Sequence, residues 1–130
     1  MNAPAGRVLV IDDQADERAI QIAMLSHLGY AVDEAADGES GLRSARESPP
    51  DVILLDIAMP RMDGFEVCRR LRADESTAHI PVLLFTASAV VDLEQKAEEA
   101  GAAGVLPKPI EPQRVALAVG RLIGGPTPPG

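Results

Sequence analysis

Five polar side chains could together carry out chemistry on a phosphoryl group. Asp12 and Asp13 are adjacent, whereas Asp56, Thr86 and Lys108 each come at the end of a short apolar run. Three carboxylates without a thiolate or a well-placed histidine suit a hard cation, and Mg2+ better than a transition metal. A lysine and a hydroxyl beside that cation would supply the positive charge and the hydrogen bond that a transferred phosphoryl group requires.

Asp56 is the natural nucleophile of this set. It stands alone after the apolar run Val52-Ile53-Leu54-Leu55, whereas the adjacent acids at positions 12 and 13 are better placed to clamp a metal ion. A carboxylate that attacks phosphorus forms an acyl phosphate, which is the covalent chemistry of aspartyl-phosphate ATPases.

Each of these residues also has an ordinary structural explanation. An acidic pair before a helix usually caps it, and for Asp12 and Asp13 taken alone capping is the better interpretation. Asp56 could be a loop acid, Thr86 a strand-end hydroxyl and Lys108 a solvated charge. Three carboxylates at one edge repel one another, however, so the set taken together favours a bound cation.

The elements that must position these side chains follow from the hydrophobic pattern. Short apolar runs rich in branched residues alternate five times with amphipathic stretches, which is typical of βα units around a parallel sheet. We predict strands over residues 7–11, 30–35, 52–55, 81–85 and 104–106. We predict helices over 14–28, 39–47, a stretch that includes 65–71, 90–100 and 111–122. Ligands of such sheets bind beyond the carboxyl ends of the strands, where the polar side chains would lie.

Helical spacing also predicts the apolar face of three helices. In the first helix the spaced apolar positions are Ile20, Ala23, Met24 and Leu28, in the third they are Phe65, Cys68 and Leu71, and in the last they are Val115, Val119 and Leu122. Gly29 and Gly101 are expected to end the first and fourth helices, because glycine readily adopts the left-handed conformation that follows a helix.

Length and composition exclude several classes of protein. The 130 residues amount to one domain, with a short N-terminal extension over 1–6, the folded domain over 7–123 and a Gly/Pro-rich tail or linker over 124–130. A net charge of −8 argues against direct binding to nucleic acid, which relies on clustered Lys and Arg. The single Cys68, the absence of a signal peptide and the absence of a membrane span predict a soluble, cytoplasmic protein.

The sequence resembles the receiver domains of two-component response regulators. The resemblance covers about residues 7–123 and rests on the joint spacing of four motifs, which are Val10-Ile11-Asp12-Asp13, Leu55-Asp56-Ile57-Ala58-Met59-Pro60 with Met62-Asp63-Gly64, Thr86-Ala87, and Lys108-Pro109. It implies an α/β, flavodoxin/CheY-like (βα)5 fold, a doubly wound five-stranded parallel sheet with strand order 2-1-3-4-5.

The resemblance implies a phosphoacceptor site that uses Mg2+ as cofactor. Asp56 would accept a phosphoryl group from a phosphohistidine of a sensor histidine kinase or a histidine phosphotransfer protein, and acetyl phosphate could substitute. Asp13 and Asp56 would ligate Mg2+ directly, Asp12 would act mainly through metal-bound water, and the backbone carbonyl of Ala58 would supply another oxygen. Ala58 and Ser88 flank the site in this family and tune the lifetime of the acyl phosphate.

The resemblance also implies a conformational switch. Lys108 would pair with Asp56 and then with the phosphoryl group, while Thr86 would move its hydroxyl onto a phosphoryl oxygen. The Lys108–Pro109 bond is often cis in this family, and proline lowers the cost of a cis bond. Many receivers carry Tyr or Phe three residues before the lysine, but this chain carries Val105, which has no ring to turn inward.

The favoured function is a stand-alone phosphoacceptor that catalyses only its own phosphorylation and dephosphorylation. It would signal to an unknown downstream protein, either by relaying phosphate to a histidine or by docking, and a phosphorylation-dependent dimer is left open. The alternative is a receiver fragment of a larger response regulator or hybrid kinase, for which 124–130 would serve as linker.

Three other classes fit less well. A Mg-dependent phosphatase generally has a second acid two positions after the nucleophile, where this chain has Ala58. A phosphorylation-independent binding module would not need all five polar residues together. An FMN-like cofactor would need Gly or Ser/Thr in the loop after the first strand to cradle its phosphate, and that loop lacks them.

Overall fold

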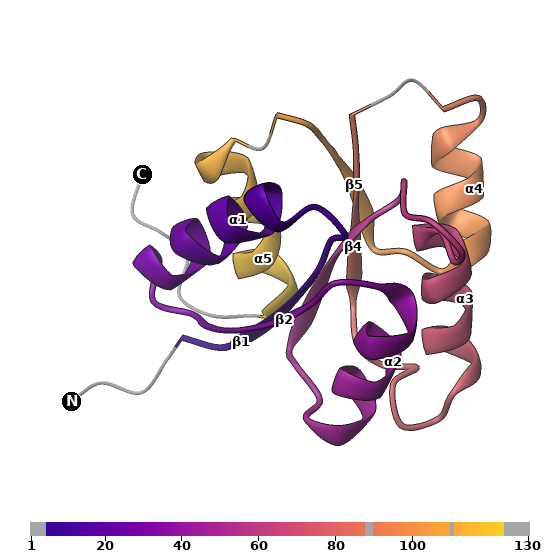
Figure 1. Ribbon diagram of the computed structural model, residues 1–130, viewed down its shortest axis with the longest axis horizontal. Coiled ribbons are helices and arrows are strands. Elements are labelled where there is room, and N and C mark those ends of the chain that lie inside the picture. The colour runs from indigo at the N-terminus through magenta and orange to yellow at the C-terminus, as the bar shows by residue number, and fades with distance from the viewer. Residues whose placement is uncertain (1–4, 88–89, 110, 124–130) are drawn as a thin grey trace.

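Five strands and five helices alternate along the chain in a computed structural model that describes residues 5–87, 90–109 and 111–123 (Figure 1). The elements are β1 (Arg7–Ile11), α1 (Ala15–His27), β2 (Ala31–Ala35), α2 (Gly38–Glu47), β3 (Val52–Asp56), α3 (Gly64–Ala73), β4 (Val82–Thr86), α4 (Leu93–Ala100), β5 (Gly104–Pro107) and α5 (Pro112–Ile123). All strand pairs are parallel, in the order β2-β1-β3-β4-β5. The predicted fold class and strand order are therefore confirmed.

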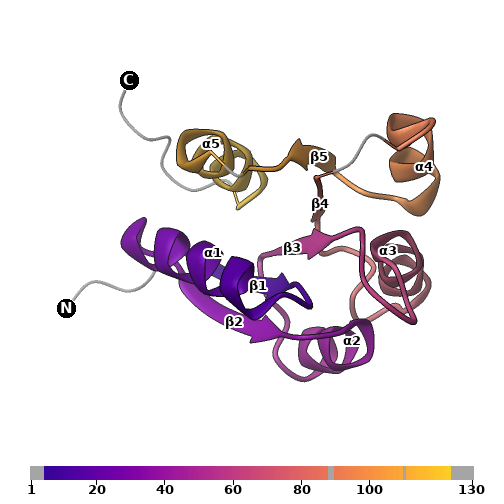
Figure 2. The ribbon, with the colours of Figure 1, turned by 45° about the horizontal axis from the view of Figure 1, so that its top comes forward.

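The helices form a layer on each face of the sheet. Helices α1 and α5 lie on one side, and α2, α3 and α4 lie on the other (Figure 2). Side chains of β1 alternate between the layers, with Val8 and Val10 in the cluster under α1 and α5, and Leu9 and Ile11 in the cluster under α2 to α4. Within the described ranges, no helix combines the length and the apolarity needed to cross a membrane.

The predicted apolar face of α1 is wrong. Three of its four residues are exposed, including Ile20 at 66% and Leu28 at 38%, and only Met24 packs against the core. The buried residues of α1 are instead Gln21 and Leu25. Gln21 can lie inside because its amide donates a hydrogen bond to Asp12, so a polar residue occupies a position that an apolar pattern cannot reveal.

Helix ends depend on a few left-handed residues. Gly29 and Gly101 have φ of 96° and 84° and follow α1 and α4, as expected from the sequence. Helix α4 begins at Leu93 rather than at Val90, because Asp92 before it has φ of 56°, which is incompatible with a continuous helix. The inward faces of α3 and α5 agree with the predicted residues.

Arg72, near the end of α3, joins two loops at the amino-terminal edge of the sheet. Its guanidinium donates to the backbone carbonyls of Ala78 and Ile80 in the loop before β4, and to that of Gly101 at 3.1 Å. One charged side chain thus holds three backbone oxygens from the connections that precede β4 and β5.

The loop between β3 and α3 folds back closely on the end of β3. Its last residue before the helix, Asp63, caps α3 by accepting a hydrogen bond from the Glu66 amide at 2.9 Å. Gly64 then approaches the strand so closely that an added Cβ would lie 2.6 Å from the backbone oxygen of Asp56. Only glycine allows this approach, which keeps the loop against the end of the strand.

Gly64→Ala is expected to lower the free energy of unfolding by about 1–3 kcal/mol, because backbone atoms of β3 must shift to admit the methyl group. Gly120→Ala is the matched control, since among the described residues no atom outside its own helical turn lies within 4 Å of its Cβ position in α5. The control should be about 0.5–1 kcal/mol more stable than the parent, because alanine is the better helix former. Urea unfolding measures both variants, and equal stability of the two would contradict the steric argument.

Candidate functional site

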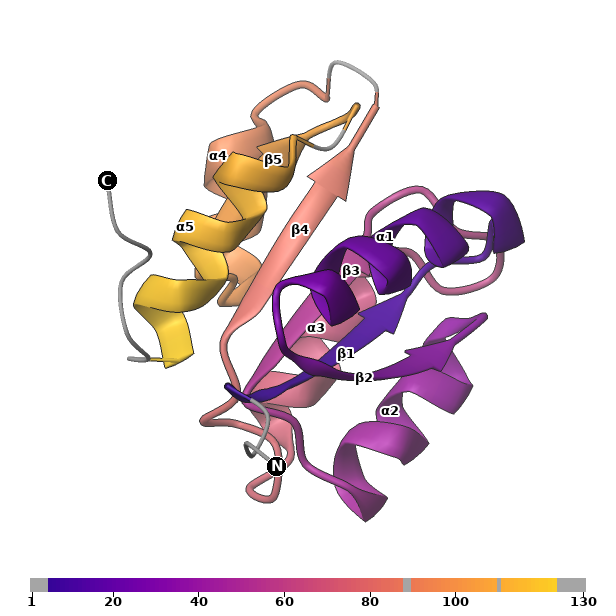
Figure 3. The same ribbon diagram turned by 90° about the vertical axis from the view of Figure 1, so that its left-hand side faces the viewer.

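The carboxyl ends of four neighbouring strands meet at one edge of the sheet. Asp12 directly follows β1, Asp56 ends β3, Thr86 ends β4, and Lys108 directly follows β5. The strands run in the same direction (Figure 3), so register alone brings these residues to the same edge. The amide of Lys108 also donates to the carbonyl of Thr86 at 2.9 Å, which ties the end of β5 to the end of β4.

Asp12, Asp13 and Asp56 form a compact acidic cluster. One carboxylate oxygen from each residue lies within 4.8 Å of the others. Asp12 and Asp56 are buried, and Asp13 is half-buried with an oxygen, Oδ1, that is shielded from solvent and has no hydrogen-bond partner in the described structure. A buried carboxylate oxygen left without a donor fits a site for a hard cation, because a cation would supply the missing partner.

Helix capping does not explain the acidic pair. Helix α1 begins at Ala15, and its N-cap residue is Gln14, whose side chain makes no capping hydrogen bond. Asp12 accepts from the Gln14 amide at 2.9 Å and from Nε2 of Gln21 at 3.0 Å. These bonds orient the Asp12 carboxylate within the cluster, before the helix begins.

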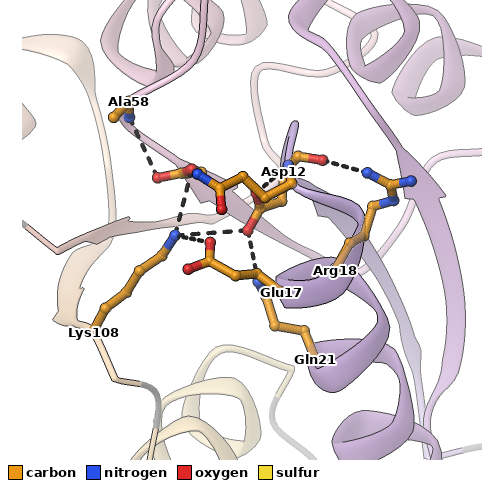
Figure 4. Close-up of polar contacts among 8 residues, drawn as sticks. Asp12, Glu17, Arg18, Gln21, Ala58 and Lys108 are labelled. Carbon is orange, nitrogen blue, oxygen red and sulfur yellow. Dashed lines mark hydrogen bonds and ion pairs between the residues drawn. The ribbon is translucent and has the colours of Figure 1, made fainter.

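Lys108 faces the acidic cluster with a largely buried side chain that is 10% exposed. Its Nζ lies 3.4 Å from Oδ2 of Asp56, 3.7 Å from Oδ2 of Asp12 and 2.5 Å from Oε2 of Glu17 (Figure 4). Burial lowers the pKa of this ammonium group, but the hydrogen bond with Glu17 and the charges of the three carboxylates outweigh burial and leave the pKa above its usual value.

The two buried carboxyl groups are poorly solvated in their charged form. Burial is the main cause that raises the pKa of Asp12, against the hydrogen bond from Gln14 and the charge of Lys108. Burial likewise raises the pKa of Asp56; the charge of Lys108 opposes this effect, and repulsion from Asp12 adds to it. The site therefore concentrates negative charge that its own lysine only partly offsets.

The other positions named from the sequence are Ala58, Ser88, Pro109 and Val105. The Ala58 amide donates to Oδ1 of Asp56 at 3.3 Å, whereas metal binding by its carbonyl stays a prediction. Ser88 lies outside the described residues. The Lys108–Pro109 bond is cis, as expected. Val105 pairs with Leu84 in the sheet and packs, half-buried, against the core cluster under α2 to α4.

Sequence reasoning missed the contribution of α1 to the site. Glu17 reaches Lys108, and Gln21, one turn later, reaches Asp12 (Figure 4). Arg18 donates to the Asp12 carbonyl at 2.7 Å and to Glu34 at 2.7 Å. The sequence offered one signal for this contribution. Glu17 and Gln21 are spaced by four in the helix that follows the acidic pair, and this spacing places them on one face of the helix.

Known proteins match most of the chain. Residues 8–120 match the family model of the response regulator receiver domain. PilH of Pseudomonas aeruginosa is 33% identical over 119 residues, which cover 92% of this chain and 98% of PilH. The response regulator PleD of Caulobacter vibrioides is 44% identical over 108 residues, which cover 82% of this chain but only 24% of PleD. The chain also spans only 48% of the length of the DNA-binding regulator RpaA of Synechocystis.

Solved structures agree with these matches. The chemotaxis protein CheY4 of Vibrio cholerae has a TM-score of 0.84 and 33% identity, and the similarity covers 89% of this chain and 97% of CheY4. A receiver domain of a sensor histidine kinase from Pseudomonas aeruginosa, crystallised with a magnesium ion in its active-site cleft, has a TM-score of 0.84 and 32% identity, over 92% of this chain and 98% of that domain. The chain therefore belongs to the response regulator receiver domain family of two-component systems.

Proposed function

We propose that this receiver domain is a phosphoacceptor, in which Asp56 takes a phosphoryl group from a phosphohistidine in a Mg2+-dependent reaction. The observation that carries the proposal is the convergence at one edge of a buried carboxylate, a lysine 3.4 Å from it, and two further acids, one of which has an unpartnered buried oxygen. These are the nucleophile, the charge and the ligand set that phosphoryl transfer requires.

The chain's own residues account for the transfer step. A carboxylate oxygen of Asp56 forms a bond to phosphorus while the N–P bond of the phosphohistidine breaks, and the leaving imidazole nitrogen keeps the electron pair and takes a proton. Lys108 lies close enough to offset negative charge on the phosphoryl oxygens. Asp13, Asp56 and the Ala58 carbonyl would hold Mg2+, with Asp12 acting through water, and bound Mg2+ would neutralise charge between phosphoryl group and carboxylates.

The change of state would be transmitted without an aromatic switch. Thr86 ends β4, and its hydroxyl would move onto a phosphoryl oxygen. The Thr86 carbonyl accepts from the Lys108 amide, so displacement of β4 would reach β5 through the backbone. Val105, which lies in β5 and packs against the core, would follow that displacement rather than rotate.

Receiver domains act with histidine kinases and downstream effector proteins, and we propose the same kinds of partner here. The nearly full-length match to PilH supports a stand-alone protein that signals through protein contacts. The partial matches to PleD and RpaA support the alternative, a receiver unit of a longer regulator. Cys68 is a free, buried thiol, which suits the reducing cytoplasm that we propose as its location.

Incubation with acetyl phosphate and Mg2+ is expected to add one phosphoryl group to the wild-type chain. Asp56→Asn should lose this labelling, because an amide cannot form the acyl phosphate. Intact-mass spectrometry measures the added mass, and borohydride trapping locates it. Asp33→Asn, which removes an exposed acid of β2, is the control that should label normally. Full labelling of Asp56→Asn would overturn the assignment of the phosphoacceptor.

Asp13→Ala is expected to weaken Mg2+ binding by at least about tenfold, because it removes a carboxylate with an unpartnered buried oxygen. Titration of Mg2+ followed by NMR amide shifts measures the dissociation constant. Asp16→Asn, an exposed acid in the first turn of α1, controls for the loss of one negative charge. Equal Mg2+ affinity of Asp13→Ala and Asp16→Asn would exclude the metal clamp.

Asp56→Asn is expected to stabilise the protein when no divalent cation is present. A carboxyl with a raised pKa stabilises the fold below its unfolded pKa, and this contribution is lost as pH rises through the folded pKa. The variant should therefore unfold a few degrees above wild type at pH 7, and the difference should close towards pH 4. Thermal unfolding in chelator measures it, and a difference independent of pH would contradict the raised pKa.

A further inference from the structure

Glu17 makes the shortest contact of the Lys108 ammonium. Its Oε2 lies 2.5 Å from Nζ, whereas the nearest oxygens of Asp56 and Asp12 lie at 3.4 and 3.7 Å. Glu17 comes from α1, far from Lys108 in the sequence, and its carboxylate points at the ammonium (Figure 4). The lysine is therefore shared between the acids of the site and an acid outside the proposed metal cluster.

Lys108 and Glu17 differ in how far their side chains are exposed to solvent, and this difference decides which of them can move away. The Lys108 side chain is 10% exposed, whereas the Glu17 side chain is 37% exposed. Glu17 can turn towards solvent at little cost, because its side chain is already partly exposed, whereas Lys108 is enclosed in the site. Any exchange of partners must therefore release Glu17 and keep the ammonium in place.

We propose that Glu17 is a positioning residue that competes with the phosphoryl group for Lys108. This inference rests on the phosphoacceptor function proposed above. In the unphosphorylated chain Glu17 draws the ammonium towards the first turn of α1. A phosphoryl group on Asp56 brings anionic oxygens to the other side of Lys108, so that the ammonium exchanges its contact with Glu17 for one with phosphoryl oxygen.

The negative charge of Glu17 determines how its removal should change the binding of an anion and of a cation. Glu17 repels an anionic phosphoryl group and also occupies one of the three hydrogen-bond donors of Lys108. It does not repel a cation. Removing its charge should therefore strengthen the binding of a phosphoryl-like anion without strengthening the binding of Mg2+. A purely structural role in holding α1 against the sheet would instead weaken both.

Gln21 keeps Asp12 in place when Lys108 exchanges one partner for another. It lies one turn after Glu17 and donates to Asp12 at 3.0 Å, independently of Lys108. The Gln14 amide holds the other oxygen of the same carboxylate. Asp12 therefore keeps its orientation when Lys108 changes partner, and a substitution of Glu17 leaves the acidic cluster with its own supports.

The test compares the binding of beryllium fluoride, a phosphoryl mimic, by the full chain at saturating Mg2+. Glu17→Gln keeps the shape of the side chain and removes its charge, so it should bind the anion about two- to fivefold more tightly than wild type. Glu17→Asp keeps the charge on a shorter arm and should lie between the two. Asp16→Asn, which removes a neighbouring exposed charge without a contact to Lys108, should bind as wild type does.

Isothermal titration measures the anion affinity, and a separate Mg2+ titration should show equal or weaker metal binding in Glu17→Gln. Equal or weaker anion binding by Glu17→Gln overturns the competition. An equal gain in Asp16→Asn also overturns it, because the effect would then come from net charge alone. Failure of wild type to bind the anion would instead overturn the phosphoacceptor function and this inference with it, so the two failures are distinguishable.

Discussion

Mutual repulsion among three carboxylates is the constraint around which this domain is arranged. Asp12 directly follows β1, and Asp56 ends the adjacent strand β3. Both side chains are buried, so the fold must hold like charges together out of water. It does so by attaching them to strands from the inside of the sheet. Strands β3 and β4 are buried along their whole length, and helices cover both faces of the sheet. The site thus lies at the end of strands that are buried throughout.

Helix α1 adds polar support to that packing. A helix on the face of a sheet usually contributes an apolar stripe, but α1 also supplies Gln21 and Arg18 to Asp12 and Glu17 to Lys108. Gln21 takes one of the two buried positions of α1, while the neighbouring Ile20 is exposed. Helix α1 gives up part of its hydrophobic contact in order to orient the groups of the site.

The sequence predicted the fold and the polar side chains that meet at its carboxyl edge, because both depend on simple patterns. Buried parallel strands are continuous apolar runs, and the polar residue that ends each run marks the edge where strands meet. The polar face of α1 could not be predicted, because Gln21 is buried through one hydrogen bond that only the tertiary structure shows. The start of α4 depended on the left-handed backbone of Asp92, a conformation that aspartate does not require. Strand order came from the family resemblance, since local patterns do not encode it.

Arg72 makes a contact at the amino-terminal edge of the sheet whose chemistry differs from that of the carboxyl edge. Its guanidinium stays charged at any pH that the protein meets, and it donates to three neutral backbone oxygens. Neither protons nor divalent cations compete for this contact. The carboxyl edge of the sheet carries buried carboxyl groups whose charge depends on acidity, whereas the Arg72 contact at the amino edge does not. The loops before β4 and β5 therefore keep this contact under conditions of acidity that change the charge of the carboxyl edge.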